Sequence, residues 1–133
     1  MTRPVIHVSI VPYEQQRYPT AGDWQLNDSS DWLITISDLG DWKMNLLVAI
    51  HEIVEQALCL ERGIEEQAVT AFDLQYEDSR RPGDESEPGD DTRAPYHREH
   101  LFATSIERQI SSELGVNWDQ YEAAIRALGE VKQ

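Results

Sequence analysis

The 133-residue sequence contains a single cysteine, Cys59, and no long apolar run. One cysteine excludes an intramolecular disulfide framework and is typical of a reducing compartment, where a lone thiol most often packs as a small buried apolar group. The longest aliphatic run, residues 46–50, spans five residues, whereas a membrane-spanning helix needs about 20. The N-terminal residues also lack the apolar stretch and cleavage site of a signal peptide. We therefore expect a soluble, cytoplasmic protein without a membrane segment.

Basic residues are also scarce, because 11 Lys and Arg stand against 25 Asp and Glu, for a formal net charge of −14. Proteins that bind nucleic acids normally present a Lys/Arg face to the phosphates, so we expect no direct binding to DNA or RNA. The acids are partly concentrated, since residues 73–91 hold eight of them against two arginines. Such a charge keeps a protein in solution or imitates nucleic acid towards a basic partner.

Two segments alternate apolar and polar residues with the period of a β-strand, residues 5–11 and residues 32–37. In the first, Ile6, Val8 and Ile10 share one face, which we expect to be buried. The polar stretch between the two segments reads as a loop with a further short strand near residues 24–26.

A long helix is expected after these strands. Asp41 is a suitable N-cap, the following residues favour helix as far as Arg62, and Gly63 is a suitable C-terminal stop. Apolar side chains cover more than half of the circumference of this helix: Leu46, Leu47, Ile50, Ile53, Val54, Ala57, Leu58 and Leu60. A helix of this kind belongs at the centre of the core.

The rest of the chain is predicted to be helical with one long interruption. Residues 64–76 form a short helix at best, and the acidic, turn-rich segment 78–94 is expected to be a flexible loop that is either solvated or closes over a site. Pro95 suits the first position of another helix, which runs to residue 115. Asn117 can cap a last helix over residues 118–128.

Together these elements predict a single α+β domain over residues 1–133. A small β-sheet packs on the long central helix, and two or three further helices complete the core.

The central helix carries the sequence His51-Glu52-Ile53-Val54-Glu55. Residues four apart lie on the same side of a helix, so His51 and Glu55 could both reach one metal ion. Glu52 lies about 100° further round the helix, where its carboxylate is free to take up a proton.

The helix after Pro95 adds a second group of candidate ligands. His97, His100 and Glu107 share a strip beside its apolar face. One of these imidazoles, together with His51 and Glu55, would make a ligand set of two histidines and one glutamate, which catalytic zinc uses with one position left for water. Spacing alone does not choose between His100 and His97. Glu107 is placed to orient a ligand imidazole.

This ligand set predicts a Zn²⁺-dependent hydrolase of peptide or amide bonds, in which Glu52 is the general base for water attack on a polarised carbonyl. A peptide or protein substrate could add to the edge of a strand such as residues 33–37.

The order of elements and the motif resemble a minimal zincin over residues 31–110. Zincins are metal-dependent hydrolases, most often peptidases, whose helix carries HExxH; the present motif is an HExxE variant. The resemblance implies that His51 is the first ligand, that Glu52 is the base, and that Glu55 stands in place of the second histidine. Compact acidic chains of this size also look similar to uncharacterised phage or prophage proteins.

Other interpretations remain open. The chain could be an acidic protein-interaction module without catalysis, such as a phage-encoded nucleic-acid mimic or inhibitor. A metal could brace two helices without catalysis, although structural zinc usually takes four protein ligands. His51 could also simply hydrogen-bond to Glu55 without a metal.

Overall fold

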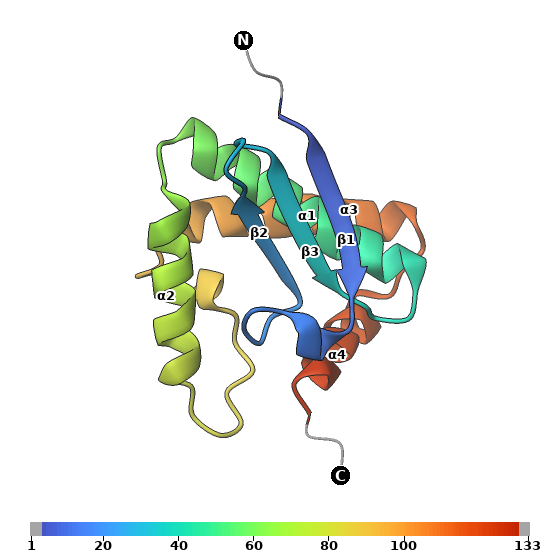
Figure 1. The fold of residues 1–133 in the computed structure, drawn as a ribbon. Coiled ribbons are helices and arrows are strands. Elements are labelled where there is room, and N and C mark those ends of the chain that lie inside the picture. Colours follow the sequence, from blue (N-terminus) through green and yellow to red (C-terminus); the bar gives the residue numbers. More distant parts are fainter. Residues whose placement is uncertain (1–3, 131–133) are drawn as a thin grey trace.

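The computed structural model describes residues 4–130, and its β-sheet has three strands (Figure 1). They are β1 (Ile6–Val11), β2 (Gly22–Leu26) and β3 (Trp32–Ser37). Their order is β1-β3-β2, with β1 parallel and β2 antiparallel to β3. All three strands expected from the sequence are confirmed.

In the described part of the chain, four helices complete the fold: α1 (Trp42–Glu61), α2 (Glu66–Asp78), α3 (His97–Glu113) and α4 (Trp118–Leu128). Two short 3₁₀ turns, η1 (Tyr13–Gln15) and η2 (Pro88–Asp90), lie in the connections. The long helix α1 packs against β2 and β3 on one side and against α3 on the other. Figure 1 shows α1 and α3 behind the sheet. The predicted α+β architecture around a central helix is therefore confirmed.

The ends of α1 are set by local interactions that were readable in the sequence. The Asp41 carboxylate accepts hydrogen bonds from the backbone N–H groups of Lys43, at 2.8 Å, and Met44, at 3.2 Å. At the other end Gly63 has a φ of 70°, a left-handed conformation that favours glycine. The core around α1 contains Ile34 and Ile36 of the sheet.

The prediction that Pro95 opens a helix was wrong. A turn precedes α3, in which the Ala94 N–H donates to Asp91 and the His97 N–H donates to Ala94. Pro95 lies within this turn, and Tyr96 takes the N-cap position. The ring of proline fixes its φ angle at a value that occurs in β-turns as well as at the start of a helix, so Pro95 fits either position.

Helix α2 is as long as the expected segment 64–76 but begins and ends two residues later, so that it ends at Asp78, the first residue of the predicted loop. Asp73, a polar residue within α2, is buried and accepts hydrogen bonds from Tyr18 and Tyr96. Tertiary contacts therefore stabilise a polar residue within the helix. The flexibility expected for residues 78–94 stays a prediction.

The expectation that one face of β1 is buried was also wrong. Ile6, Val8 and Ile10 are 47%, 46% and 54% exposed. Helix α1 covers β3 and β2 and leaves the edge strand β1 largely uncovered, so the alternation marks a strand but not a covered one. Cys59 is buried, as expected. Within residues 4–130 no helix combines the length and the apolarity that crossing a membrane requires.

Candidate metal centre

Three side chains from α1 and α3 converge in the interior of the protein. His51 Nε2 lies 3.0 Å from Glu55 Oε2 and 3.1 Å from His100 Nδ1. His100 Nδ1 is also 3.1 Å from Glu55 Oε2, so the three atoms form a nearly equilateral triangle. Each of these residues is less than 9% exposed. The helical pitch aligns His51 with Glu55, and the packing of α3 on α1 brings in His100.

The size of this triangle fits a metal ion. Tetrahedral zinc, with bonds of about 2.0–2.1 Å, holds its ligand atoms roughly 3.3 Å apart. The observed separations of 3.0 to 3.1 Å fall only about 0.3 Å short of that spacing. Two imidazole nitrogens and one carboxylate oxygen are also the donor types that zinc accepts.

The outer nitrogens of both imidazoles face carboxylates. His51 Nδ1 is 2.8 Å from Glu107 Oε1. His100 Nε2 is 3.1 Å from Asp90 Oδ1 and 3.1 Å from Glu87 Oε2. A carboxylate here accepts an N–H bond, which leaves the inner nitrogen of the same neutral ring with its lone pair.

The three atoms of the triangle, His51 Nε2, Glu55 Oε2 and His100 Nδ1, are then all hydrogen-bond acceptors with no proton between them. Such a group attracts a cation. Without a cation, protons must take its place. Burial opposes the charged imidazoles, but the hydrogen bonds to Asp90, Glu55 and Glu87 outweigh it and raise the pKa of His100 to about 12. Hydrogen bonds to Glu107 and Glu55 likewise outweigh burial and raise the pKa of His51.

Both oxygens of Glu55 are engaged. Its Oε1 accepts a hydrogen bond of 3.2 Å from Trp24 Nε1 on β2, which leaves Oε2 for the triangle. Burial alone would raise the pKa of Glu55, but the hydrogen bonds from His100 and His51 lower it to about 2. Glu55 is therefore an ionised acceptor at neutral pH.

A second set of contacts fixes Glu107. Its other oxygen accepts a hydrogen bond from the hydroxyl of Tyr121, a fully buried residue of α4. Helix α4 therefore supports the carboxylate that orients His51. The sequence did not predict this contact, which depends on how α4 packs on α3.

Glu52 lies beside the triangle and is 8% exposed. Burial, and then the charge of Glu55, raise the pKa of its carboxyl group. No hydrogen bond joins its carboxylate to another side chain within residues 4–130, and the residue lines the cavity next to His51 and His100. A buried carboxylate of this kind is a stronger base than an exposed one.

The backbone of β2 packs directly on Glu52 at Gly22. A Cβ atom at position 22 would lie 2.7 Å from Val48 Cγ1 and 2.8 Å from Glu52 Oε1. Only glycine fits there without moving one of these groups.

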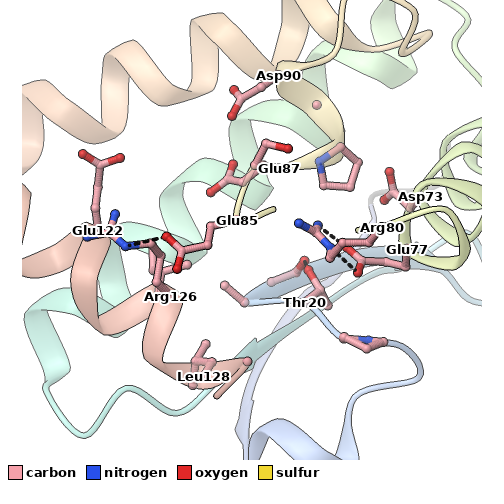
Figure 2. Close-up of a pocket in the computed structure, with 18 of the residues that line it drawn as sticks. Thr20, Asp73, Glu77, Arg80, Glu85, Glu87, Asp90, Glu122, Arg126 and Leu128 are labelled. Atoms are coloured by element: carbon pink, nitrogen blue, oxygen red, sulfur yellow. Dashed lines mark hydrogen bonds and ion pairs between the residues drawn. The ribbon is translucent and has the colours of Figure 1, made fainter. Parts of the chain in front are cut away.

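The cavity that contains these groups has a volume of about 940 Å³. Its walls come from the loop before β2, from α2, from residues 79–96 and from α4. Figure 2 shows the rim, where Glu85 of the loop pairs with Arg126 of α4 at 3.2 Å and Arg80 pairs with Glu77 at 2.7 Å. Glu87 and Asp90 lie above this rim.

The structure does not bring His97 into the triangle. Its Nδ1 lies 2.8 Å from the carbonyl oxygen of Gly89, so it donates to the acidic loop instead. The loop also packs closely, because a Cβ atom at Gly89 would lie 2.3 Å from His100 Cγ. His97 therefore holds the loop at Gly89 against α3 through this hydrogen bond, whereas His100 faces the triangle. Glu87, Asp90 and His100 form a second group of close ligand atoms, which shares His100 with the first.

The strand expected to receive a peptide at its edge lies in the middle of the sheet. β3 pairs with β1 on one side and β2 on the other, so its backbone groups are already bonded. The prediction of edge addition at residues 33–37 was wrong. Pairing is a long-range property that the sequence pattern of one strand does not reveal.

Comparisons with protein-family models, with curated proteins and with solved structures found no match for this chain.

Proposed function

We propose that this chain is a Zn²⁺-dependent hydrolase of peptide or amide bonds. The single observation that carries the proposal is the convergence of His51 Nε2, Glu55 Oε2 and His100 Nδ1 within 3.1 Å of one another, beside a buried carboxylate that no side chain within residues 4–130 engages. Three protein ligands leave a coordination position free, as in catalytic zinc sites.

The ligand residues each have a defined part. His51, Glu55 and His100 hold the ion, and Glu107 keeps the His51 ring turned so that Nε2 faces inward. Asp90 and Glu87 do the same for His100 Nδ1. When bound, Zn²⁺ supplies Lewis acidity, which acidifies water and polarises the carbonyl oxygen of an amide.

Glu52 acts first as the general base and then as the general acid in this mechanism. Its carboxylate takes a proton from water as the water oxygen attacks the amide carbon. It then passes that proton to the leaving nitrogen as the C–N bond breaks. The raised pKa of Glu52 makes its carboxylate a stronger base towards water.

Charge on the cavity wall favours a substrate that carries positive charge. The loop and helices contribute acids around the opening: Glu77, Asp84, Glu85, Glu87, Asp90 and Glu122. Of the three arginines there, Arg80 and Arg126 are paired with acids of the rim. The uncompensated acids would attract lysine or arginine side chains of a peptide.

Part of the negative charge lies in the interior, where it cannot imitate the surface of a nucleic acid. Of the 25 acidic residues, six are buried: Asp23, Glu52, Glu55, Asp73, Glu99 and Glu107. Four of these six line the cavity of the candidate site: Glu52, Glu55, Asp73 and Glu107. These four carboxyl groups therefore do not contribute to a charged outer surface. A mimic needs its charge on a continuous surface.

Zinc analysis of protein purified without a histidine tag tests the proposal. We expect about one zinc per chain in the native protein and in His7→Ala, a control that removes an exposed histidine of β1. His51→Ala should lose the metal. Equal zinc content in His51→Ala and the native protein would refute the site.

Hydrolysis then tests catalysis separately from metal binding. Glu52→Gln should keep its zinc and cleave a fluorogenic peptide library at least about 100-fold more slowly than the native protein, the usual contribution of a general base. Cleavage at the native rate by this variant would exclude Glu52 as the base.

A further inference from the structure

Residues 80–87 cross the opening of the cavity from α2 to α4, and every residue of this segment lines the cavity. At the α2 end Arg80 pairs with Glu77 at 2.7 Å, and towards α4 Glu85 pairs with Arg126 at 3.2 Å (Figure 2). The 80–87 segment is therefore held at both sides of the opening.

Polar contacts, and not apolar packing, hold the 80–87 segment in place. Apart from the ring of Pro82 it has no aliphatic or aromatic side chain, and all but its first residue are exposed. The hydroxyl groups of Ser86 and Tyr76 share a hydrogen bond on the α2 side. On the α4 side, the side chains of Glu85 and Arg126 are 64% and 42% exposed. Ion pairs as exposed as this one are weak, because water and salt screen them.

The segment has a folded shape of its own. The Asp84 N–H donates to the Arg81 carbonyl oxygen at 3.0 Å, and Gly83 has a φ of 84°. With Pro82 before this glycine, the four residues fit a type II turn. The Arg80 guanidinium also donates to the Asp84 carbonyl oxygen at 2.6 Å. These internal bonds allow the segment to move as a unit once its contact with α4 opens.

The neighbours of the segment on both sides are fixed by the fold. Before it lies α2, whose Val69 belongs to the core. After it lies η2, where the Gly89 carbonyl accepts a hydrogen bond from His97, and a Cβ atom at Gly89 would lie 2.3 Å from His100 Cγ. A movement of the 80–87 segment therefore need not disturb the metal centre.

The position of the metal centre makes such a movement necessary for a polypeptide substrate. His51, Glu52, Glu55 and His100 are each less than 9% exposed. A scissile amide has to reach these groups while the substrate chain continues outwards on both sides of the amide bond. A segment that is held at both sides of the opening blocks a continuous chain.

We propose that the 80–87 segment is a lid, that the ion pair of Glu85 with Arg126 keeps it closed, and that a polypeptide substrate enters when this pair opens. Lids of this kind admit the substrate and then exclude water from the reaction. The entry of a substrate rests on the proposed hydrolase, whereas the opening of the lid does not.

Limited proteolysis tests the opening without metal or hydrolysis by this protein. Trypsin cuts the bond between Arg80 and Arg81 when the segment is released, and such cutting follows the population of the open form. We expect Arg126→Gln to speed this cut about 1.5- to 5-fold, since exposed ion pairs contribute about 0.2–1 kcal/mol. Arg98→Gln is the matched control, because Arg98 is an exposed arginine of α3 outside the cavity wall. Equal rates in Arg126→Gln, Arg98→Gln and the native protein would overturn the proposal.

A cross-link tests whether the lid controls entry. Glu85→Cys and Arg126→Cys are combined and joined by a short bis-maleimide with a reducible spacer, which takes the place of the two paired side chains. Cys59 is buried and stays unmodified. The same double variant capped with N-ethylmaleimide is the control, since it carries similar modifications without the bridge.

We expect the bridged protein to keep its zinc, to resist trypsin at Arg80 and to lose cleavage of the peptide library, and reduction of the spacer should restore both reactions. A bridged protein that cleaves peptides as fast as the capped control would overturn the lid while leaving the hydrolase intact. A native protein without any peptide cleavage would instead refute the hydrolase, and the trypsin rates would still decide whether the segment opens at Arg126.

Discussion

Replacing Gly89 with alanine would disturb the metal centre through a residue that is not itself a ligand. A Cβ atom there would lie 2.3 Å from Cγ and 2.4 Å from Nδ1 of His100. Ordinary contacts between such atoms need about 3.4 Å or more, so the ring or the loop must move by about 1 Å. His100 is 4% exposed and has little room to move.

Either movement weakens the site. If the ring moves, Nδ1 leaves its place 3.1 Å from both His51 Nε2 and Glu55 Oε2, and metal–ligand distances tolerate only about 0.2 Å. If the loop moves, His100 loses its contacts with Asp90 and Glu87. Loss of such supporting contacts typically costs about 10–100-fold in metal affinity, or roughly 1.4–2.8 kcal/mol.

The measurement is a competition titration of zinc against a chromophoric chelator. Gly129→Ala is the control, because its new Cβ would meet its nearest atom at 3.8 Å, an ordinary contact, and its φ is −84°. We expect Gly129→Ala to keep the native Kd and Gly89→Ala to raise it at least about 10-fold. A folded Gly89→Ala protein with the native Kd would refute the assignment of His100 as a ligand in this geometry.

Three further predictions follow from buried groups. Gly22→Ala should displace Glu52, whose Oε1 would be 2.8 Å from the new Cβ; we expect zinc content to stay native and peptide cleavage to fall at least about 10-fold, and unchanged cleavage would contradict the packing argument. Tyr121→Phe leaves a buried oxygen of Glu107 without its donor, so urea unfolding should show a loss of about 1–3 kcal/mol, and a variant as stable as the native protein would show that this contact is unimportant. Burial raises the pKa of Asp73 to about 7, above its unfolded value of 3.8, so its stabilising contribution is complete below about pH 4 and is lost as the pH rises through 7. Relative to Asp73→Asn, the native protein should lose on the order of 2 kcal/mol in unfolding free energy between pH 5 and pH 8, and a constant difference would rule out this pKa.

The sequence predicted those features that depend on neighbouring residues. The period of the side chains and the caps at Asp41 and Asn117 located α1 and α4 to within a residue or two. The same local geometry placed His51 and Glu55 on one side of α1, because the pitch of a helix does not depend on the rest of the fold. The strands β1 and β3 also followed from alternation alone.

The tertiary structure decided which distant groups meet. His97 and His100 stand on the same helix, and only the rotation of α3 against α1 turns His100 towards Glu55 and His97 towards Gly89. The order of the strands, which pairs both edges of β3 and leaves β1 open, is likewise a long-range outcome.

The local pattern therefore determined half of the candidate site, the pair on α1 together with its base Glu52. The docking of α3, of α4 and of the acidic loop supplied the rest, His100 with the supporting contacts from Tyr121 and Asp90. The physical reason is that helix pitch and capping act over a few residues, whereas packing depends on the whole core, which brings together residues 49 positions apart.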